Sequence, residues 1–168
     1  MQNNLKMTRY CRQLYQSPLG PLSVVVDEES LVGIWFCDQA NCEQGLEHIE
    51  EACQQLHEAV FEWLDQYFLG ENPSMPFPLS PKGTDFQQRV WTYLAQIPYG
   101  ESRTYGEIAR ALSCRSAQAI GQAVGRNPLI LLIPCHRVLG VENKLPGYAA
   151  GLDRKRWLLN HEAIPWKE

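Results

Sequence analysis

A cysteine and a histidine stand side by side in the segment PCHRV, at Cys135 and His136. A thiol acts as a nucleophile only as its thiolate, and its ordinary pKa is about 8.5, so a base or a positive field must assist it. The imidazole of His136 is the nearest candidate base in the sequence. The pair therefore indicates nucleophilic chemistry at Cys135, and a buried structural cysteine beside a hydrogen-bonded histidine is the alternative.

The two side chains are not expected to touch on an extended chain, because neighbouring residues point to opposite faces. A sharp turn after Pro134, or one bridging water, would connect them. An imidazole that relays a proton gains from a carboxylate on its second nitrogen, and Glu162 is a candidate for that group. A cysteine hydrolase would need a distant histidine, such as His48, His57 or His161, and none of these lies in a recognisable motif.

The other five cysteines show no CxxC pair, and a chain of 168 residues does not need disulfide staples. We read them as reduced thiols that pack as small hydrophobic side chains. No second cysteine or histidine lies at ligand spacing from the Cys135–His136 pair, so no metal site is expected there. Metal binding by the first domain stays open, because Cys11, Cys37, Cys42, His48 and His57 could supply ligands, although they lack ligand spacing. The five cysteines other than Cys135 are Cys11, Cys37, Cys42, Cys53 and Cys114.

Short β-strands separated by turns are expected in residues 10–38, where Pro18, Gly20 and Pro21 mark one turn. Residues 45–69 follow a helical period and predict one long amphipathic helix. Its apolar stripe consists of Ile49, Ala52, Leu56, Val60, Trp63 and Tyr67. Residues 1–69 are therefore expected to form a strand-rich α/β domain, and the proline-rich residues 70–83 a linker.

Residues 84–168 are expected to form a second, mostly helical domain. Helices are predicted at 86–97, 104–112, 116–125 with Ser116 as N-cap, and 152–162. The apolar run 129–133 reads as a buried extended segment that leads to Cys135. In the last helix we expect Leu152 and Leu159 to face inward, and Arg154 and Lys155 to be available to solvent or phosphate.

The two short helices at 104–112 and 116–125 resemble a helix-turn-helix, although helical hairpins without DNA are also common. The second of them is rich in alanine and glycine, so it can lie close to another surface, either a neighbouring helix or a DNA groove. Residues 1–83 carry four Lys/Arg and twelve Asp/Glu, whereas residues 84–168 carry eleven and seven. This asymmetry favours contact between the second half and an anion, and ordinary surface scatter is the alternative.

No apolar stretch reaches the length of a membrane span, and the start MQNNLKMTRY lacks the apolar core of a secretion signal. We therefore expect a cytoplasmic protein with no membrane partner, and a monomer in solution. The α+β fold class follows from a small sheet with one helix and a helical second domain, whose helix-turn-helix would be winged-helix-like.

Three segments together identify a family resemblance: PCHRV (134–138), GRNP (125–128) upstream and GYAAGLDRKRWLLNHE (147–162) downstream. In this order and spacing they resemble the O6-alkylguanine-DNA alkyltransferases, also called methylated-DNA–protein-cysteine methyltransferases. The segment GTDFQQRVWTYLAQIPYGESRTYGEIA (83–109) is similar to the start of the same domain. The resemblance is close over residues 83–162, and covers the first 80 residues only in outline.

The resemblance implies direct-reversal DNA repair, in which an alkyl group moves irreversibly from O6-alkylguanine, or O4-alkylthymine, to Cys135 in a single turnover. The partner would be double-stranded DNA with alkylated bases, whose target base is flipped out of the stack. No cofactor is implied. A non-catalytic module that only recognises alkylated bases is the alternative, and the presence of Cys135 favours active transfer.

The resemblance also implies roles for particular residues. His136 would act on Cys135 through a water, Glu162 would orient His136, and Asn127 would brace the turn before the active-site segment. Tyr105 would lie beside the target nucleotide and protonate the departing guanine. Tyr148 would belong to the loop that covers the pocket, and backbone groups of Cys135, Val138 and Ala149 would bind the guanine edge.

The second helix would lie in the minor groove, where small residues permit close approach. Two positions depart from the family pattern. Gln118 stands where an arginine usually fills the space of the flipped base. Either Arg115 substitutes for that arginine from a turn that is one residue short, or the flipped base is less well supported. Ala150 replaces a common glycine in the pocket loop, so its methyl is expected to narrow the pocket. The expected groove contacts are Ala117, Ala119, Gly121 and Ala123.

Overall fold

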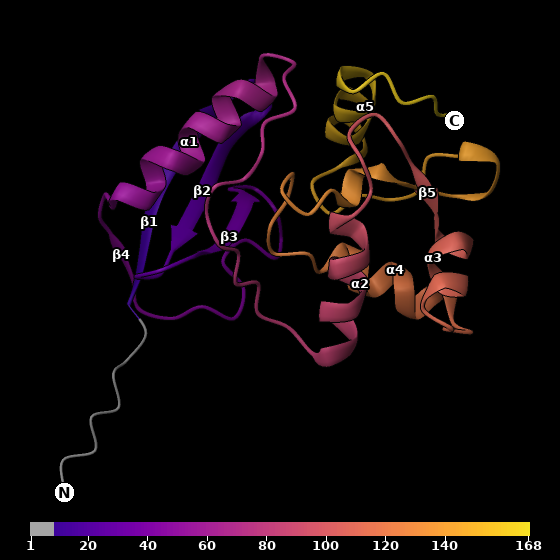
Figure 1. Cartoon of the computed structure of the whole chain (residues 1–168), viewed down its shortest axis with the longest axis horizontal. Coiled ribbons are helices and arrows are strands. Elements are labelled where there is room, and N and C mark those ends of the chain that lie inside the picture. Colours follow the sequence, from indigo (N-terminus) through magenta and orange to yellow (C-terminus); the bar gives the residue numbers. More distant parts are fainter. Residues whose placement is uncertain (1–8) are drawn as a thin grey trace, which may run out of the picture.

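The computed structural model describes residues 9–168, and Figure 1 shows a sheet with one covering helix beside a group of shorter helices. The expected absence of a secretion signal, and the first residues of the predicted first domain, concern residues 1–8, which lie outside the described part. The fold is of the mixed α+β class that the sequence predicts. The division into two domains with a linker stays a prediction, because a continuous apolar core extends from the sheet to the C-terminal helices.

The first part of the chain forms a four-stranded sheet in the order β3-β2-β1-β4. Strand β1 (Tyr10–Ser17) is antiparallel to β2 (Gly20–Val26), which is antiparallel to β3 (Leu31–Phe36), while β4 (Ile49–Glu51) is parallel to β1. Gly20 has φ +116°, a conformation that suits glycine at the β1–β2 turn. Every residue of β3 is buried, because this edge strand of the sheet is covered by the second half of the chain.

Helix α1 (Gln55–Phe68) lies along one face of the sheet (Figure 1) and is shorter than the sequence predicts. The prediction of a helix from residue 45 is wrong, because Ile49 belongs to β4 and packs on the opposite face of the sheet with Val25 and Trp35. The helix begins after Gln54, whose backbone N–H donates to Nδ1 of His57 at 3.0 Å. The apolar residues of β4 and of α1 follow the same helical spacing by coincidence, so the sequence pattern suggested a single helix over residues 45–69.

The second part consists of α2 (Asp85–Ala95), α3 (Tyr105–Ala111), α4 (Ala117–Gly125) and α5 (Leu152–His161). Short elements join them: β5 (Arg103–Thr104) pairs with β6 (Val138–Leu139), and 3-10 helices lie at Cys135–Arg137 (η1) and Val141–Asn143 (η2). The predicted N-cap at Ser116 is confirmed, since its side chain accepts from Ala119 N at 3.1 Å. Helices α3 and α4 follow one another across a short turn, and the closer likeness to a winged helix stays a prediction.

The apolar run 129–133 is buried, but the prediction that it is extended is wrong. Ile133 N donates to Leu129 O at 2.9 Å, which closes a turn, and Leu131 has φ +74°. Ile34 of β3 donates to Pro128 O at 2.8 Å and accepts from Ile130 N at 3.2 Å. The run therefore covers the edge of the sheet with a turn, and this fixes the position from which η1 starts.

Helix α5 differs from its predicted orientation at two positions. Leu159 is fully buried as expected, but Leu152 is 39 % exposed, so it does not face inward. Lys155 is only 1 % exposed, and the expectation that it is available to solvent or phosphate is wrong. Its Nζ donates to Val138 O at 2.7 Å, which satisfies a buried cation that the helical period alone would place elsewhere.

Candidate active site

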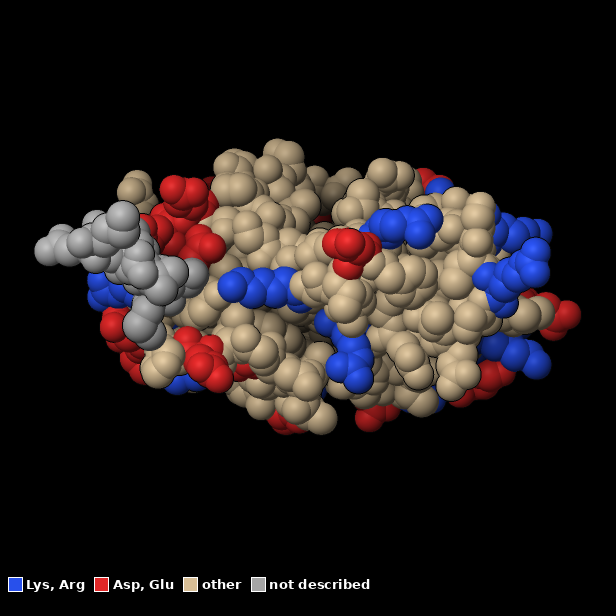
Figure 2. All heavy atoms as spheres, turned by 90° about the horizontal axis from the view of Figure 1, so that it is seen from below, with Lys and Arg blue, Asp and Glu red and all other residues tan. Residues whose placement is uncertain are grey.

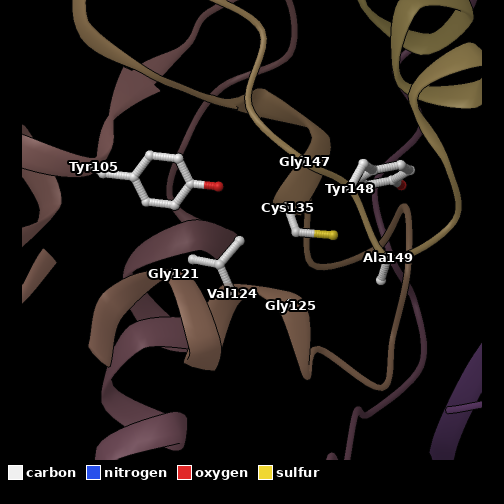
Figure 3. A pocket seen from close by; sticks show the side chains of 8 residues that line it. All are labelled: Tyr105, Gly121, Val124, Gly125, Cys135, Gly147, Tyr148 and Ala149. Atoms are coloured by element: carbon white, nitrogen blue, oxygen red, sulfur yellow. The ribbon is translucent and has the colours of Figure 1, made fainter. Parts of the chain in front are cut away.

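A cavity of about 240 Å³ opens beside Cys135 (Figure 3). It is smaller than the roughly 300–1,000 Å³ sites that hold drug-sized ligands, so it suits one small group. In Figure 3 the Tyr105 hydroxyl points toward Cys135, and the Cys135 sulfur points toward the loop that carries Tyr148 and Ala149. The lining residues are Tyr105, Gly121, Val124, Gly125, Cys135, Gly147, Tyr148 and Ala149.

Cys135 and His136 are consecutive residues of the 3-10 helix η1, which begins directly after Pro134. In such a helix consecutive side chains are about 120° apart, so the two side chains do not alternate as they would on a strand. Cys135 is 5 % exposed and His136 is fully buried. A sharp turn after Pro134, one of the two arrangements expected from the sequence, is therefore present.

The structure brings His136 and Glu162 together, although they lie 26 residues apart. Nε2 of His136 is 2.5 Å from Oε2 of Glu162, and both side chains are buried. Nδ1 of His136 is buried and makes no hydrogen bond to any of the residues described. A buried polar atom without a partner is uncommon, and at a reactive site it marks a group that is available to a substrate or a water.

Glu162 is surrounded by donors. Its Oε1 accepts from Arg137 Nε at 2.7 Å and from Gly100 N at 3.1 Å, and its Oε2 accepts from Tyr67 Oη at 2.7 Å. Burial acts to raise the pKa of Glu162, but the contacts with His136 and Arg137 outweigh it and hold that pKa well below its usual range. Glu162 is thus an anion, and Arg137 is its permanent counter-charge.

The protonation of His136 follows from its neighbours. Burial lowers the pKa of His136, so the ring is neutral despite its contact with Glu162. A neutral imidazole carries one proton, and contact with an anionic carboxylate requires that proton on Nε2. Nδ1 is then the unprotonated nitrogen, and it is the atom that lacks a partner. The residue that follows Cys135 in the chain therefore has an unprotonated nitrogen that can act as a base.

The thiol itself lies in an apolar environment with a few polar groups near it. Burial raises the pKa of Cys135, while Asn127, the ammonium of Lys155 and Tyr148 act in the opposite direction. Lys155 is also buried, and burial lowers its own pKa to about 8. Because the ordinary state of the sulfur here is the thiol, a base is required to make the nucleophile.

Asn127 braces the turn that precedes η1. Its Nδ2 donates to Ile133 O at 2.7 Å, and its Oδ1 accepts from Leu129 N at 2.9 Å. Both amide groups are thus used across the run 129–133, as the family resemblance implies. The consequence is a fixed direction for Pro134 and Cys135 where the chain reaches the cavity.

Tyr105 and Tyr148 lie at different parts of the cavity wall. Burial raises the pKa of Tyr105 to about 12, so its hydroxyl stays protonated and can donate. The hydroxyl of Tyr148 is buried without a hydrogen-bond partner among the residues described, and burial also raises its pKa. Two unpaired polar atoms therefore belong to residues of this site: one on Tyr148, which acts on the Cys135 thiol, and one on His136, the next residue in the chain.

Two residues expected at the substrate lie outside the cavity lining. Val138 is buried in β6, and its carbonyl already accepts from Lys155, so a second hydrogen bond there stays a prediction. Ala150 is buried in the apolar core, and its carbonyl accepts from Arg154 Nη1 at 3.2 Å. The expectation that the Ala150 methyl narrows the pocket is wrong, since that residue does not line it.

The residues expected to meet DNA divide into exposed and buried groups. Arg115, Ala117 and Gln118 are exposed at the start of α4, Ala119 is half-buried, and Gly121 lines the cavity. The expectation for Ala123 is wrong: it is 3 % exposed, and its carbonyl accepts from Trp91 Nε1 at 2.8 Å. One face of α4 therefore packs in the core and the opposite face is exposed, as in an amphipathic helix.

Charge is unevenly distributed over the surface. On the face shown in Figure 2, acidic side chains gather toward the end formed by the sheet, and most basic side chains lie over the other end. Gln122, four residues after Gln118, is also exposed and continues the same surface of α4. That residue was missed in the sequence, although its spacing from Gln118 was a usable signal.

Sequence reasoning also missed three residues behind the thiol: Lys155, Arg137 and Tyr67. Arg137 lies in the PCHR segment and could have been predicted as the partner of Glu162, because a buried carboxylate needs a cation. Tyr67 lies 95 residues from Glu162, and no spacing rule connects them. Within residues 9–168, no three His, Cys, Asp or Glu side chains are grouped to hold a metal, and no helix is long and apolar enough to cross a membrane.

Comparison with protein families gives two matches along the chain. The DNA binding domain of 6-O-methylguanine DNA methyltransferase matches residues 85–164. The ribonuclease-like domain of 6-O-methylguanine DNA methyltransferase matches residues 10–81. Together they span nearly all of the described chain.

Individual relatives are similar over most of their length. A methylated-DNA–protein-cysteine methyltransferase of Methanosarcina acetivorans is 41 % identical, over 89 % of this chain and 96 % of its own. A constitutive enzyme of the same name from Bacillus subtilis is 42 % identical, over 91 % and 95 %. The crystal structure of Mycobacterium tuberculosis OGT in complex with DNA has a TM-score of 0.82 and 39 % identity, and covers 92 % of each chain.

Proposed function

Because the chain belongs to the 6-O-methylguanine DNA methyltransferase family and repairs DNA by alkyl transfer, we propose that Cys135 accepts the alkyl group from O6-alkylguanine. The observation that carries this proposal is the set of groups around one sulfur. All six cysteines lie in the described part, and Cys135 alone lines the cavity and precedes His136, the residue that contacts Glu162.

The reaction begins with loss of the thiol proton. Nδ1 of His136 takes it through one water, while Glu162 holds the other nitrogen and stabilises the imidazolium that forms. The sulfur of Cys135 then attacks the saturated carbon on O6, a carbon–sulfur bond forms, and the carbon–oxygen bond breaks. The electron pair leaves with guanine, whose ring takes a proton from the Tyr105 hydroxyl. The imidazolium of His136 then returns a proton to Tyr105 through water, so the proton lost by the thiol ends on guanine.

The balance of atoms makes the protein a single-turnover reagent. One thiol and one O6-alkylguanine become one thioether and one guanine, so no cofactor takes part and nothing regenerates the sulfur. O4-alkylthymine presents the same chemistry, an alkyl group on an exocyclic oxygen. The backbone of Cys135, Val138 and Ala149 would bind the edge of the base, and Tyr148 would cover it.

The alkylated base must leave the stack to reach the sulfur of Cys135, a residue that is only 5 % exposed. Helix α4 would approach the minor groove with Ala117, Ala119 and Gly121, whose small side chains leave room for the backbone. Gln118 and Arg115 lie at the exposed start of that helix, where they would fill or flank the space of the flipped base. Phosphate contacts from the basic second half supply affinity without sequence preference.

The protein would act as a monomer in the cytoplasm, with residues 1–69 and 84–168 as its two domains. Support for the location comes from the family, because a protein that repairs DNA works in the compartment that holds the DNA. Support for the division comes from the family matches, which end and begin on either side of residue 83.

Intact-protein mass spectrometry tests the proposal. After incubation with duplex DNA that contains O6-methylguanine, the protein should gain the mass of one methylene group, and DNA with plain guanine should give no gain. An unchanged mass from a protein that still binds the damaged duplex would instead support a module that recognises alkylated bases without repairing them.

A further inference from the structure

The anion behind the active site is contacted by both halves of the chain. Three donors to Glu162 come from the second half: His136, Arg137 and the backbone of Gly100. The fourth is the Tyr67 hydroxyl, which belongs to α1 on the sheet and lies 2.7 Å from Oε2. Oε2 is also the oxygen that contacts His136, so one atom is shared by Tyr67 and the base.

Tyr67 is held firmly enough to serve as a reference point. It is 1 % exposed, and its ring stacks on Trp63 with centroids 5.5 Å apart and planes 6° apart. Its backbone carbonyl lies 2.7 Å from Nε2 of His161, the residue immediately before Glu162. Helix α1 thus contacts the end of α5 through both the hydroxyl and the carbonyl of a single residue.

We propose that Tyr67 is a positioning residue for alkyl transfer, which acts from helix α1 by fixing the oxygen of Glu162 that orients His136. The inference rests on the proposed function, because it gives Tyr67 a task only if His136 serves Cys135. Tyr67 lies outside the cavity lining, so its effect on the reaction passes through Glu162.

The shared oxygen determines the direction of the effect. A hydroxyl that donates to Oε2 withdraws charge from it and weakens its hold on the His136 proton. Without that donor, Oε2 becomes more basic and stabilises the imidazolium, so His136 gains its second proton at higher pH. The other charged groups that bear on the pair are Arg137, beside Glu162, and Lys155, whose charge opposes protonation of His136.

Tyr67→Phe isolates the hydroxyl, because phenylalanine keeps the ring in its stack. The rate of methyl transfer should fall most at low pH, and the acid limb of the rate profile should move upward by about half a unit to one unit. Tyr99→Phe is the matched control. The Tyr99 ring lies 6.3 Å from that of Tyr67, but its hydroxyl makes no hydrogen bond to Glu162.

Single-turnover rates across pH, normalised to the fraction of protein that accepts one methyl, measure the effect on folded protein alone. A limb that stays in place, an equal fall at all pH values, or an equal shift in Tyr99→Phe would overturn the role of Tyr67. In a Glu162→Gln background, Tyr67→Phe should cause no further shift, and an additional shift would also overturn it.

Failure of this inference is distinguishable from failure of the proposed function. If wild-type protein gains no methyl from damaged DNA, the proposed function itself fails. If wild-type protein gains one methyl and the acid limb of Tyr67→Phe is unmoved, only the positioning role of Tyr67 is lost.

Discussion

The cluster behind Cys135 and the exposed face of α4 differ in burial, charge and hydrogen bonding. The carboxylate of Glu162, the guanidinium of Arg137 and the imidazole of His136 are buried together. Each oxygen of Glu162 accepts from two donors. The residues on the outer face of α4, such as Gln118, are uncharged, and most of them are exposed to water. Buried charges respond strongly when one partner is removed, whereas exposed contacts are individually weak. Chemistry and recognition should therefore respond to mutation on different scales.

Replacement of the nucleophile should give the largest effect and separate the two regions completely. Cys135→Ser should abolish methyl transfer, because a hydroxyl is far less acidic than a thiol, and should leave DNA affinity unchanged. Transfer is measured with methyl-labelled DNA, and affinity with a fluorescent duplex. Transfer by Cys135→Ser would show that another cysteine is the acceptor, and Cys114→Ser, a half-buried cysteine in the turn before α4, is the control.

Neutralising the buried anion should lower both rate and stability. Glu162→Gln leaves Arg137 buried without its counter-charge, which typically costs roughly 3–5 kcal/mol in the free energy of unfolding. Denaturant melts measure this cost. Glu168→Gln is the control, because its pair with Arg156 is exposed and should be worth about 0–1 kcal/mol.

The same pair of variants has a distinct pH signature. The pKa of Glu162 is lower in the folded state than in the unfolded chain, so its stabilisation is present above about pH 4.3 and is lost as the pH falls further. Wild type and Glu168→Gln should lose stability over that acid range, and Glu162→Gln should lose less. Equal acid sensitivity in all three proteins would contradict the account of the buried cluster.

The buried lysine gives a signature at alkaline pH. Burial lowers the pKa of Lys155 to about 8, below its unfolded value of about 10.4, so the charged form costs stability when both states are protonated. As the pH rises from about 8 to 10, the unfolded chain binds more protons, and the free energy of unfolding should increase by on the order of 2–3 kcal/mol from this group.

Lys155→Met should remove that increase, while Lys144→Met, at an exposed lysine, should keep it. Urea melts at a series of pH values give the slope directly. An identical slope for wild type and Lys155→Met would show that Lys155 is not the buried group described above.

A change on α4 should have the smallest effect and should depend on salt. Gln118→Arg adds a cation where the helix would enter the groove, so DNA affinity should rise several-fold at low salt. The slope of log affinity against log salt should become steeper by about one. Glu62→Gln makes the same change in net charge on the remote helix α1 and is the control; equal gains in both variants would mean that only net charge matters.

Local signals in the sequence predicted much of the second half. Ser116 and the PCHR segment are local signals, which depend only on residues close to them in the chain. In the structure Ser116 caps α4, and the PCHR segment forms the turn of η1. The turn at 129–133 was not predictable in the same way, because an apolar run looks alike in a strand and in a buried turn. Its shape depends on Asn127 and on the edge of β3, which is far away in the sequence.

The missed residues share one physical reason. Lys155 is a helix position that periodicity assigns to the surface, but its side chain is buried and its Nζ donates to Val138 O. Tyr67 looks like one more apolar position of α1, and its hydroxyl gains a partner only when α1 meets the end of α5. Contacts between segments that are distant in the chain determine the surroundings of both residues, and a single sequence does not reveal such contacts.

Peptide mapping after complete reaction tests the central claim most directly. The protein is saturated with O6-methylguanine DNA and digested with trypsin, which releases residues 127–137 with Cys135 as the one cysteine they contain. The account predicts one methyl per chain, on that peptide, and none on the peptides that carry the other five cysteines. A methyl on any other cysteine, or spread among several, would contradict it.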